Sequence, residues 1–256
     1  MIELKTKREV EAMMEAGRIS AKVLRLVGAA VEPGISTKEL DAMAERLFKA
    51  EGAKPGFKGY GGFPGSICAS VNNEIVHGIP SKKKILREGD IISIDTGAIV
   101  DGWYGDNAWT YPVGEVAPDV QMLLEVTEQA MWDGLDAARA GNRLGDIGAA
   151  VERNANKHKL GVVRELVGHG IGRDMHEEPN VPNYGLKHFG RKLEVGMCLA
   201  IEPMFNLGTR KIAYHDDGWL ITTLDGKWSA HFEKSVAITP EGPVILTTEP
   251  DHKRPV

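Results

Sequence analysis

The chain has 256 residues and a formal net charge of −5; 42% of its residues are hydrophobic and 26% are charged. These values are typical of a globular protein, and they exclude a disordered chain and an overall basic nucleic-acid-binding protein. No apolar stretch reaches the about 18 residues of a membrane span, and the N-terminus lacks the apolar segment of a secretory signal. From these two absences we expect no membrane contact. The two cysteines, Cys68 and Cys198, cannot make a disulfide framework, so we expect a cytoplasmic protein.

Two helices are predicted at the beginning of the chain. Thr6 and Glu9 fit a capping box, in which each side chain accepts a hydrogen bond from an otherwise unpaired backbone N–H group. Apolar residues then recur with helical spacing. Ser36 or Thr37 is expected to begin the second helix, and Gly52 to end it, because glycine readily adopts the left-handed conformation that follows a helix.

The rest of the chain alternates between predicted strands and helices. A glycine-rich loop over 55–65, which carries three aromatic residues, follows the second helix. Apolar runs and helical spacing then predict strands over 67–71, 75–76, 91–94 and 103–111, helices over 119–140 and 145–157, and strands over 162–167, 197–201, 219–223 and 232–238.

The two halves of the chain share this order of elements, and their residues match at an offset of 107. In both halves, Leu-x-x-Gly precedes an apolar run that ends in an acid. The matching residues are Leu86, Gly89 and Asp95 in one half and Leu193, Gly196 and Glu202 in the other. We predict a single α/β domain over 1–256 with pseudo-symmetric halves, roughly 1–112 and 113–256, and a ligand site between them. The alternative is two helix–strand units that are alike by coincidence.

Two acids are predicted to lie close together in a hairpin. Asp101-Gly102 is a strong signal for a two-residue turn, which places Asp106 opposite Gly97. Because side chains alternate along a strand, Asp95 shares a face with Gly97, so the two carboxylates are neighbours and Gly97 leaves room between them. Two like charges this close require a cation or a proton. Flanking apolar residues disfavour the alternative, an exposed acidic hairpin.

Three further side chains complete a candidate metal site. Glu202 ends an apolar run at the repeat position of Asp95, His169 lies between glycines that leave its imidazole accessible, and Glu233 lies in a strand pattern. Taken singly, each is better explained by a structural role. Together with Asp95 and Asp106 they supply four carboxylates and one imidazole, a set that suits two hard or borderline divalent ions.

Two more histidines are candidates for substrate contact. His77 precedes Gly78-Ile79, and His176 precedes Glu177-Glu178-Pro179. An imidazole next to a metal centre can polarise a carbonyl group or hold an amide. A structural role is the alternative for each of them.

These motifs resemble those of type I methionine aminopeptidases over essentially the whole chain. The residues that carry the resemblance are Ser93-Ile94-Asp95-Thr96-Gly97, Tyr104-Gly105-Asp106-Asn107, Gly168-His169-Gly170-Ile171-Gly172, Ala200-Ile201-Glu202-Pro203 and His231-Phe232-Glu233. The resemblance implies an α+β pita-bread fold, in which two pseudo-symmetric halves form a curved antiparallel sheet covered by helices. The repeat at an offset of 107 agrees with this fold.

The resemblance also implies roles for the metal-site residues. Asp95 chelates one ion, Asp106 and Glu233 bridge both ions, and His169 and Glu202 complete the second. The cofactor is a pair of divalent ions, with Co, Mn, Fe and Zn as the candidates.

The implied activity is removal of the initiator methionine from nascent proteins whose second residue is small. Besides Glu202, the implied catalytic residues are His77 and His176, which also contact the substrate. The implied methionine pocket consists of Tyr60, Phe63, Cys68 and Trp219. The implied partners are the N-termini of nascent polypeptides. Independently of the resemblance, the basic run Lys82-Lys83-Lys84 is a candidate for ribosome contact, although a solvated loop is the more common explanation of such a run. We expect a monomer without direct nucleic-acid specificity.

Three residues depart from the family pattern. Met175 stands where an aromatic residue is common, and His231 and Lys234 stand where the family often has glutamine and histidine. The pocket wall and the surroundings of Glu233 are therefore open questions at the level of sequence.

Three rival functions remain at this stage. A proline-directed peptidase of the same fold, resembling aminopeptidase P or prolidase, shares the metal motifs, but such enzymes usually carry an extra N-terminal domain for which we expect no room. A binding protein that has lost its metals is opposed by the five intact ligand positions. A mononuclear iron oxygenase leaves three acids unexplained. Metal analysis distinguishes these classes: a peptidase of this fold binds two metal equivalents, the binding protein binds none, and the oxygenase binds one.

Overall fold

The computed structural model describes residues 2–249, within which four α-helices form. They are α1 (Lys7–Gly28), α2 (Thr37–Ala50), α3 (Pro118–Ala137) and α4 (Leu144–His158). The predicted capping box of Thr6 and Glu9 begins α1, and a second one formed by Ser36 and Glu39 begins α2. Ser36, rather than Thr37, is therefore the N-cap of the second helix.

The strands within residues 2–249 pair antiparallel in four sheets. The first contains β1 (Lys54–Pro55), β4 (Ile91–Val100), β2 (Ile67–Val71) and β5 (Trp103–Pro112). The second contains β15 (Gly242–Ile245), β14 (Lys234–Thr239), β9 (Cys198–Ile201), β7 (Gly168–Gly170) and β8 (Glu177–Val181). Two smaller sheets contain β13 (Ser229–His231), β10 (Met204–Asn206) and β6 (Gly161–Val162), and β11 (Ile212–Tyr214), β12 (Ile221–Thr223) and β3 (Glu74–Val76).

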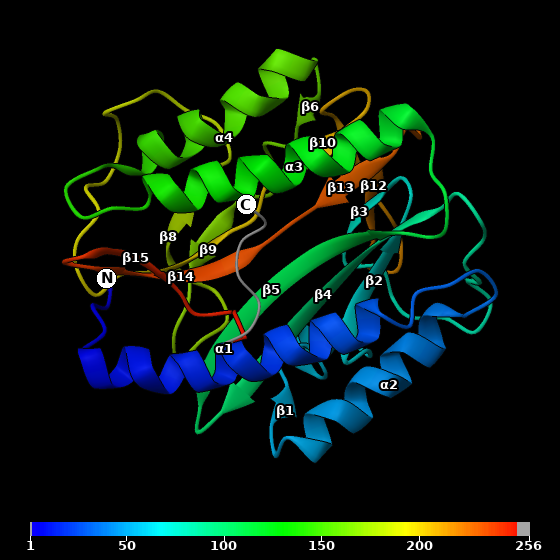
Figure 1. Ribbon diagram of the computed structural model, residues 1–256, viewed down its shortest axis with the longest axis horizontal. Coiled ribbons are helices and arrows are strands. Elements are labelled where there is room, and N and C mark those ends of the chain that lie inside the picture. The colour runs from blue at the N-terminus through cyan, green and yellow to red at the C-terminus, as the bar shows by residue number, and fades with distance from the viewer. Residues whose placement is uncertain (1, 250–256) are drawn as a thin grey trace.

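The helices cover the sheets in two pairs, as Figure 1 shows. Helices α1 and α2 lie on one side of the molecule, where α1 packs against β4 and β5, and α3 and α4 lie on the other, where α3 packs against β13 and β14. Each pair buries an apolar cluster against its strands. Because the strands are antiparallel, the class is α+β, as the resemblance implies, rather than the α/β class expected from the alternation of elements alone.

Equivalent backbone hydrogen bonds occur in the two halves at the predicted offset of 107. Gly34 N–H donates to the Leu86 carbonyl at 2.8 Å, and Gly141 N–H donates to the Leu193 carbonyl at 3.0 Å. Both glycines have a positive φ, 99° and 93°, which favours glycine because it has no Cβ. The same turn therefore precedes α2 in one half and α4 in the other.

The two halves meet where β5 runs antiparallel to the segment 231–235. The facing residues are Asp106 with Ser235, Ala108 with Glu233, and Thr110 with His231. Ala108 and Glu233 exchange backbone hydrogen bonds of 2.9 and 3.4 Å, and the Ser235 hydroxyl donates to the Asp106 carbonyl at 2.7 Å. This junction brings Asp106 and Glu233, which are far apart in sequence, onto neighbouring strands.

The predicted strand over 162–167 is wrong beyond Val162. Val162 pairs with Phe205 in β10, but Arg164 then turns into solvent and forms an ion pair with Glu152. The strand-like apolar run ends there because its charged residues are satisfied outside the sheet.

Within residues 2–249, none of the helices combines the length and apolar character needed to cross a membrane. Cys68 and Cys198 are both buried and unpaired, as expected without a disulfide framework. The cytoplasmic location stays a prediction, as does the single domain over 1–256.

Candidate metal centre and substrate pocket

The hairpin that carries the first two acids forms with the predicted register. Val100 pairs with Trp103 and Gly97 pairs with Asp106 across β4 and β5. The turn residue Asp101 has a φ of 49°, which suits the two-residue hairpin turn. Asp95 therefore lies diagonal to Asp106 on one face of the sheet, as the sequence predicts.

The space above Gly97 is filled by protein. A Cβ on Gly97 would lie 2.9 Å from the methyl end of Met175 and 3.5 Å from the ring of Phe57. The prediction that Gly97 leaves empty space between the two carboxylates is therefore wrong, because Met175 and Phe57 occupy that space. The glycine instead allows Met175 and Phe57 to form the floor of a pocket next to the acids.

His169 projects from β7 toward the acids. Its Nδ1 donates to the Gly170 carbonyl at 2.8 Å, which leaves the Nε2 lone pair directed into the site, 3.5 Å from Glu202 Oε1 and 4.0 Å from Asp106 Oδ2. A histidine whose other nitrogen is bound in this way is suited to hold a metal ion.

The glycines around His169 do not make it accessible. His169 is only 6% exposed, and a Cβ on Gly168 or Gly170 would lie 2.3 or 2.2 Å from the carbonyl oxygens of Ala200 and Glu178. These glycines allow neighbouring backbones to approach closely, so the predicted accessibility of the imidazole is wrong. The close approach nevertheless fixes the position of the ring.

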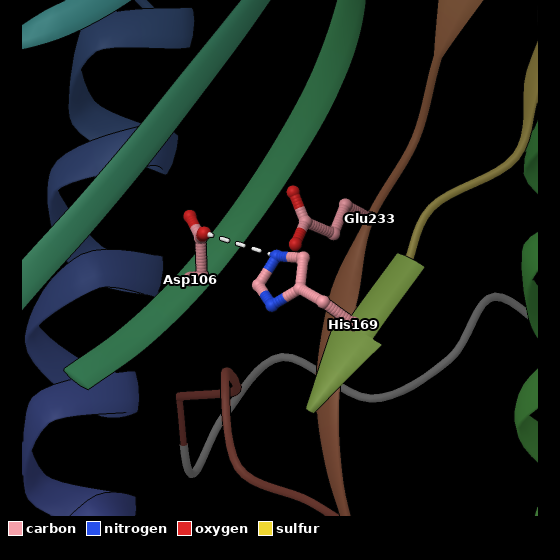
Figure 2. A group of neighbouring side chains, drawn as sticks. All are labelled: Asp106, His169 and Glu233. Carbon is pink, nitrogen blue, oxygen red and sulfur yellow. Dashed lines mark ion pairs between the residues drawn. The ribbon is translucent and has the colours of Figure 1, made fainter. Parts of the chain in front are cut away.

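Asp106, His169 and Glu233 offer ligand atoms that all lie within 4.8 Å of one another. Figure 2 shows these side chains converging from β5, β7 and the segment before β14. Glu202 follows β9, and its backbone carbonyl is held by the Asn183 amide at 2.9 Å. The structure thus brings the predicted ligands together from both halves of the chain.

Several carboxylate oxygens of the candidate metal site lack the hydrogen-bond partners that buried polar groups normally have. Asp95 Oδ1, Asp106 Oδ1 and Glu233 Oε1 are buried without a hydrogen bond. Burial raises the pKa of Asp106 to about 7, and burial together with neighbouring carboxylates raises the pKa of Asp95 and Glu233 well above the usual range. Orphaned and mutually repelling oxygens fit divalent cations, which supply the missing positive charge.

His231 and Lys234, which depart from the family pattern, differ in their relation to the site. His231 Nε2 lies 3.7 Å from Glu202 Oε2 and 3.8 Å from Glu233 Oε2, and burial lowers its pKa to about 3, so the ring is neutral. Lys234 instead donates to the Thr247 carbonyl at 3.0 Å. Of the two, His231 shapes the surroundings of the carboxylates.

An apolar pocket adjoins the carboxylates. The lining of this cavity, of about 110 Å³, includes all of the predicted site residues: Tyr60, Phe63, Cys68, His77, Asp95, Asp106, His169, His176, Glu202, Trp219 and Glu233. Phe63 and Trp219 make an edge-to-face contact with their ring centroids 5.1 Å apart. The cavity thus has a carboxylate end and an apolar end.

The cavity lining also contains Val76, which sequence reasoning missed, and Met175 and His231, whose roles it left open. Phe57 lines the cavity too: the aromatic residues of the glycine-rich loop suggest a lining role, but only Tyr60 and Phe63 are assigned to the pocket from the sequence. Val76 belongs to a short strand and carries no such signal.

His77 and His176 face the cavity from opposite halves. His77 has a φ of 59°, an unusual conformation for a residue with a side chain, and its ring lies edge-to-face with Trp219 at 6.3 Å. His176 Nδ1 forms a 2.8 Å hydrogen bond with the Tyr60 hydroxyl, and the ring centroids of His176 and His169 are 4.3 Å apart. Loss of water around its ring lowers the pKa of His176, although the residue as a whole is exposed.

Comparison with known proteins defines the class to which this fold and site belong. A family model described as metallopeptidase family M24 matches residues 11–240. The chain therefore belongs to this family, whose members are metal-dependent peptidases, and a divalent-metal cofactor follows from that membership.

Individual relatives narrow the class. Methionine aminopeptidase 1 of Bacillus subtilis strain 168 is 52% identical over 247 residues, which cover 96% of this chain and 99% of that protein. The crystal structure of a methionine aminopeptidase from Thermotoga maritima has a TM-score of 0.95 and 42% identity, covering 97% of this chain and all of that one. These likenesses confirm the resemblance to type I methionine aminopeptidases and the pita-bread fold.

The proline-directed alternative has weaker support. A prolidase from Pyrococcus furiosus has a TM-score of 0.76 and 23% identity, and the match covers 98% of this chain and 66% of that one. At this identity the likeness shows a shared fold alone, so prolidase-like activity is not favoured.

Removal of divalent ions is expected to destabilise the protein. An ion at about 100 times its Kd adds about 2.7 kcal/mol, which corresponds to a Tm increase of about 5–10 °C for a chain of this size. The measurement is thermal unfolding of chelator-treated protein before and after each divalent ion is restored. A Tm that no ion changes contradicts a metal site at these carboxylates.

Proposed function

We propose that this protein removes the N-terminal methionine from nascent polypeptides whose second residue is small, with two divalent ions as cofactor. The observation that carries the proposal is the cavity itself, where orphaned carboxylate oxygens lie next to an apolar pocket. The full-length likeness to methionine aminopeptidases supports the same activity.

Five side chains would hold the two ions. By the family resemblance, Asp95 would bind one ion, Asp106 and Glu233 both ions, and His169 and Glu202 the second. The convergence of Asp106, His169 and Glu233, with Glu202 3.5 Å from His169, supports a shared site. The chemistry that such ions supply when bound is activation of a water molecule and polarisation of the substrate carbonyl. Carboxylate-rich sites of this kind accept Co, Mn, Fe or Zn, so reconstitution must identify the ion.

His176 would stabilise the charge that develops on the carbonyl oxygen of the scissile bond. In this role the Tyr60 hydroxyl, 2.8 Å from Nδ1, would donate to that nitrogen, so that the ring proton would lie on Nε2. A neutral imidazole in this tautomer is a hydrogen-bond donor toward the substrate. Such donors contribute most when the developing charge lies in a site that excludes water.

Glu202 would carry a proton from the attacking water to the leaving amine. Its carboxylate lies 3.5 Å from His169 Nε2, beside the ions that it would help to hold, and a carboxylate at that position can accept a proton and release it again. His77, on the opposite side of the cavity, would contact the substrate beyond the scissile bond.

The apolar end of the cavity would select the first side chain. Phe63, Cys68 and Met175 are buried there, with Trp219 and Tyr60 at the edge, so an unbranched thioether fits the available surface. A single methylene group changes selection by only about 1–3 kcal/mol, so norleucine should also be accepted. Branched or charged first residues should be rejected.

A peptide panel tests this proposal. Metal-stripped protein, restored with each divalent ion in turn, is expected to cleave Met-Ala-X and Met-Gly-X, to cleave norleucine analogues more slowly, and to leave Met-Leu-X largely intact. Equal cleavage of Met-Ala-X and Met-Leu-X contradicts the selection for small second residues. Preferred cleavage of Ala-Pro-X supports the proline-directed alternative instead.

The remaining partner assignments stay predictions. In the candidate basic patch, Lys84 is paired with Glu74 at 2.5 Å, while Lys82 and Lys83 are exposed. Ribosome contact through this loop would therefore depend mainly on two lysines. The monomeric state and the cytoplasmic location are likewise proposed from the sequence.

A further inference from the structure

A buried lysine near the N-terminus contacts the loop that carries His176. Lys5 is 6% exposed, and its ammonium group forms an ion pair with Glu177, the residue after His176. The two residues are 172 positions apart in sequence. Burying two charges costs several kcal/mol unless their geometry is good and further hydrogen bonds satisfy them. Such a pair is therefore weak evidence for a contribution to stability.

Glu177 also organises the loop itself. Its Oε1 accepts hydrogen bonds from the backbone N–H groups of Arg173, at 2.8 Å, and Asp174, at 3.3 Å. A Cβ on Gly172 would lie 2.5 Å from Glu177 Oε1 and from Lys5 Cε, so the loop closes tightly around this carboxylate. The loop conformation over 172–177 thus depends on where the Glu177 side chain is held.

Lys5 is itself fixed to the scaffold of the site. Its backbone N–H donates to the Gly196 carbonyl at 2.7 Å, just before β9, the strand that leads to Glu202. On the other side of the loop, the Gly172 carbonyl accepts at 2.9 Å from the N–H group of Tyr104, in the strand β5 that carries Asp106. The loop is thereby held between β5, which carries Asp106, and β9, which leads to Glu202.

We propose that Lys5 is a positioning residue for catalysis. It acts through Glu177 to keep the imidazole of His176 in the orientation in which it forms its hydrogen bond with Tyr60. The inference rests on the function proposed above, and it adds to it a residue that lies outside the cavity lining. Without the lysine charge, Glu177 loses its partner and the 172–177 loop can relax. A displacement of about 1 Å at a catalytic group can cost about 100-fold in rate.

The test compares Lys5→Met with Lys5→Arg and with the control Lys7→Met, which removes an exposed lysine two positions further along. Lys5→Met is expected to lower kcat on Met-Ala-X by about 10- to 100-fold, with KM and metal content close to those of the wild type. Lys5→Arg should recover a large part of the loss, because arginine can still pair with Glu177. Lys7→Met should behave as the wild type.

A double variant shows whether the effect passes through His176. In the His176→Ala background, Lys5→Met is expected to cause no further loss of kcat, because the group that it positions is absent. An equal additional loss in that background overturns the proposal, since Lys5 would then act on the enzyme as a whole. An unchanged kcat for the single variant Lys5→Met overturns it as well.

An NMR measurement separates this inference from the proposed function. The ¹⁵N signals of the His176 ring report the Tyr60 hydrogen bond without any substrate, and Lys5→Met should shift them while Lys7→Met does not. If Lys5→Met does not fold, Glu177→Gln should produce the same shift, because it removes the charge but keeps an acceptor for the loop. Unshifted signals in the folded variant overturn the positioning role. Absence of peptide cleavage by the wild type, with the shift present, contradicts only the proposed function.

Discussion

Replacing Asp106 with asparagine is expected to lower aminopeptidase activity by at least about 10³-fold and to reduce the metal content below two equivalents per chain. Asp106 is 4% exposed, its Oδ1 has no hydrogen-bond partner, and its Oδ2 lies 4.0 Å from His169 Nε2. Asparagine has the same shape, so the hairpin should persist. It cannot supply the negative charge that a carboxylate shared by two cations must provide, and its NH₂ group is not a ligand.

The matched control is Asp101→Asn, the same substitution at the turn of the same hairpin. Asp101 is exposed and has a φ of 49°, a conformation that asparagine adopts readily. Activity and metal content of this control should equal those of the wild type. Metal analysis and peptide hydrolysis are measured on both variants. Near-wild-type turnover of Asp106→Asn with full metal occupancy contradicts the dinuclear assignment.

The sequence predicts the local part of this site well. The Asp101-Gly102 turn fixes the register that places Asp106 opposite Gly97, because a two-residue turn leaves no freedom in strand pairing. The repeat at an offset of 107 indicates that Asp95 and Glu202 occupy equivalent places, and equivalent turns precede α2 and α4. Both signals depend on short stretches of sequence, so they can be recognised without a structure.

The contacts between the halves are not predictable in the same way. The antiparallel pairing of β5 with 231–235 and the bond between Tyr60 and His176 join segments more than 100 residues apart, and no local pattern specifies such contacts. Lys5 appears in the sequence as an ordinary polar residue before a helix, yet it is buried. The glycines beside His169 also mislead, because glycine serves accessibility and close backbone packing equally well.

His176→Ala is expected to lower kcat by about 10²–10³-fold while both metal equivalents stay bound. His176 lies outside the group of converging ligand atoms formed by Asp106, His169 and Glu233, so its removal should not release an ion. What the variant loses is the proposed Nε2–H donor, whose ring is held by the 2.8 Å hydrogen bond between Nδ1 and the Tyr60 hydroxyl. Because that donor acts mainly on charge that develops in the transition state, KM should change little.

Two further variants define the origin of this loss. His158→Ala removes an exposed histidine at the end of α4, outside the cavity lining, and should leave both kcat and metal content unchanged. Tyr60→Phe keeps the imidazole but removes the hydroxyl that fixes its tautomer, so its kcat should fall between those of the wild type and His176→Ala. Steady-state kinetics and metal analysis are measured on all three variants. Loss of metal from His176→Ala makes this residue a ligand and contradicts the donor role, whereas retained metal with a reduced kcat places its contribution in the transition state.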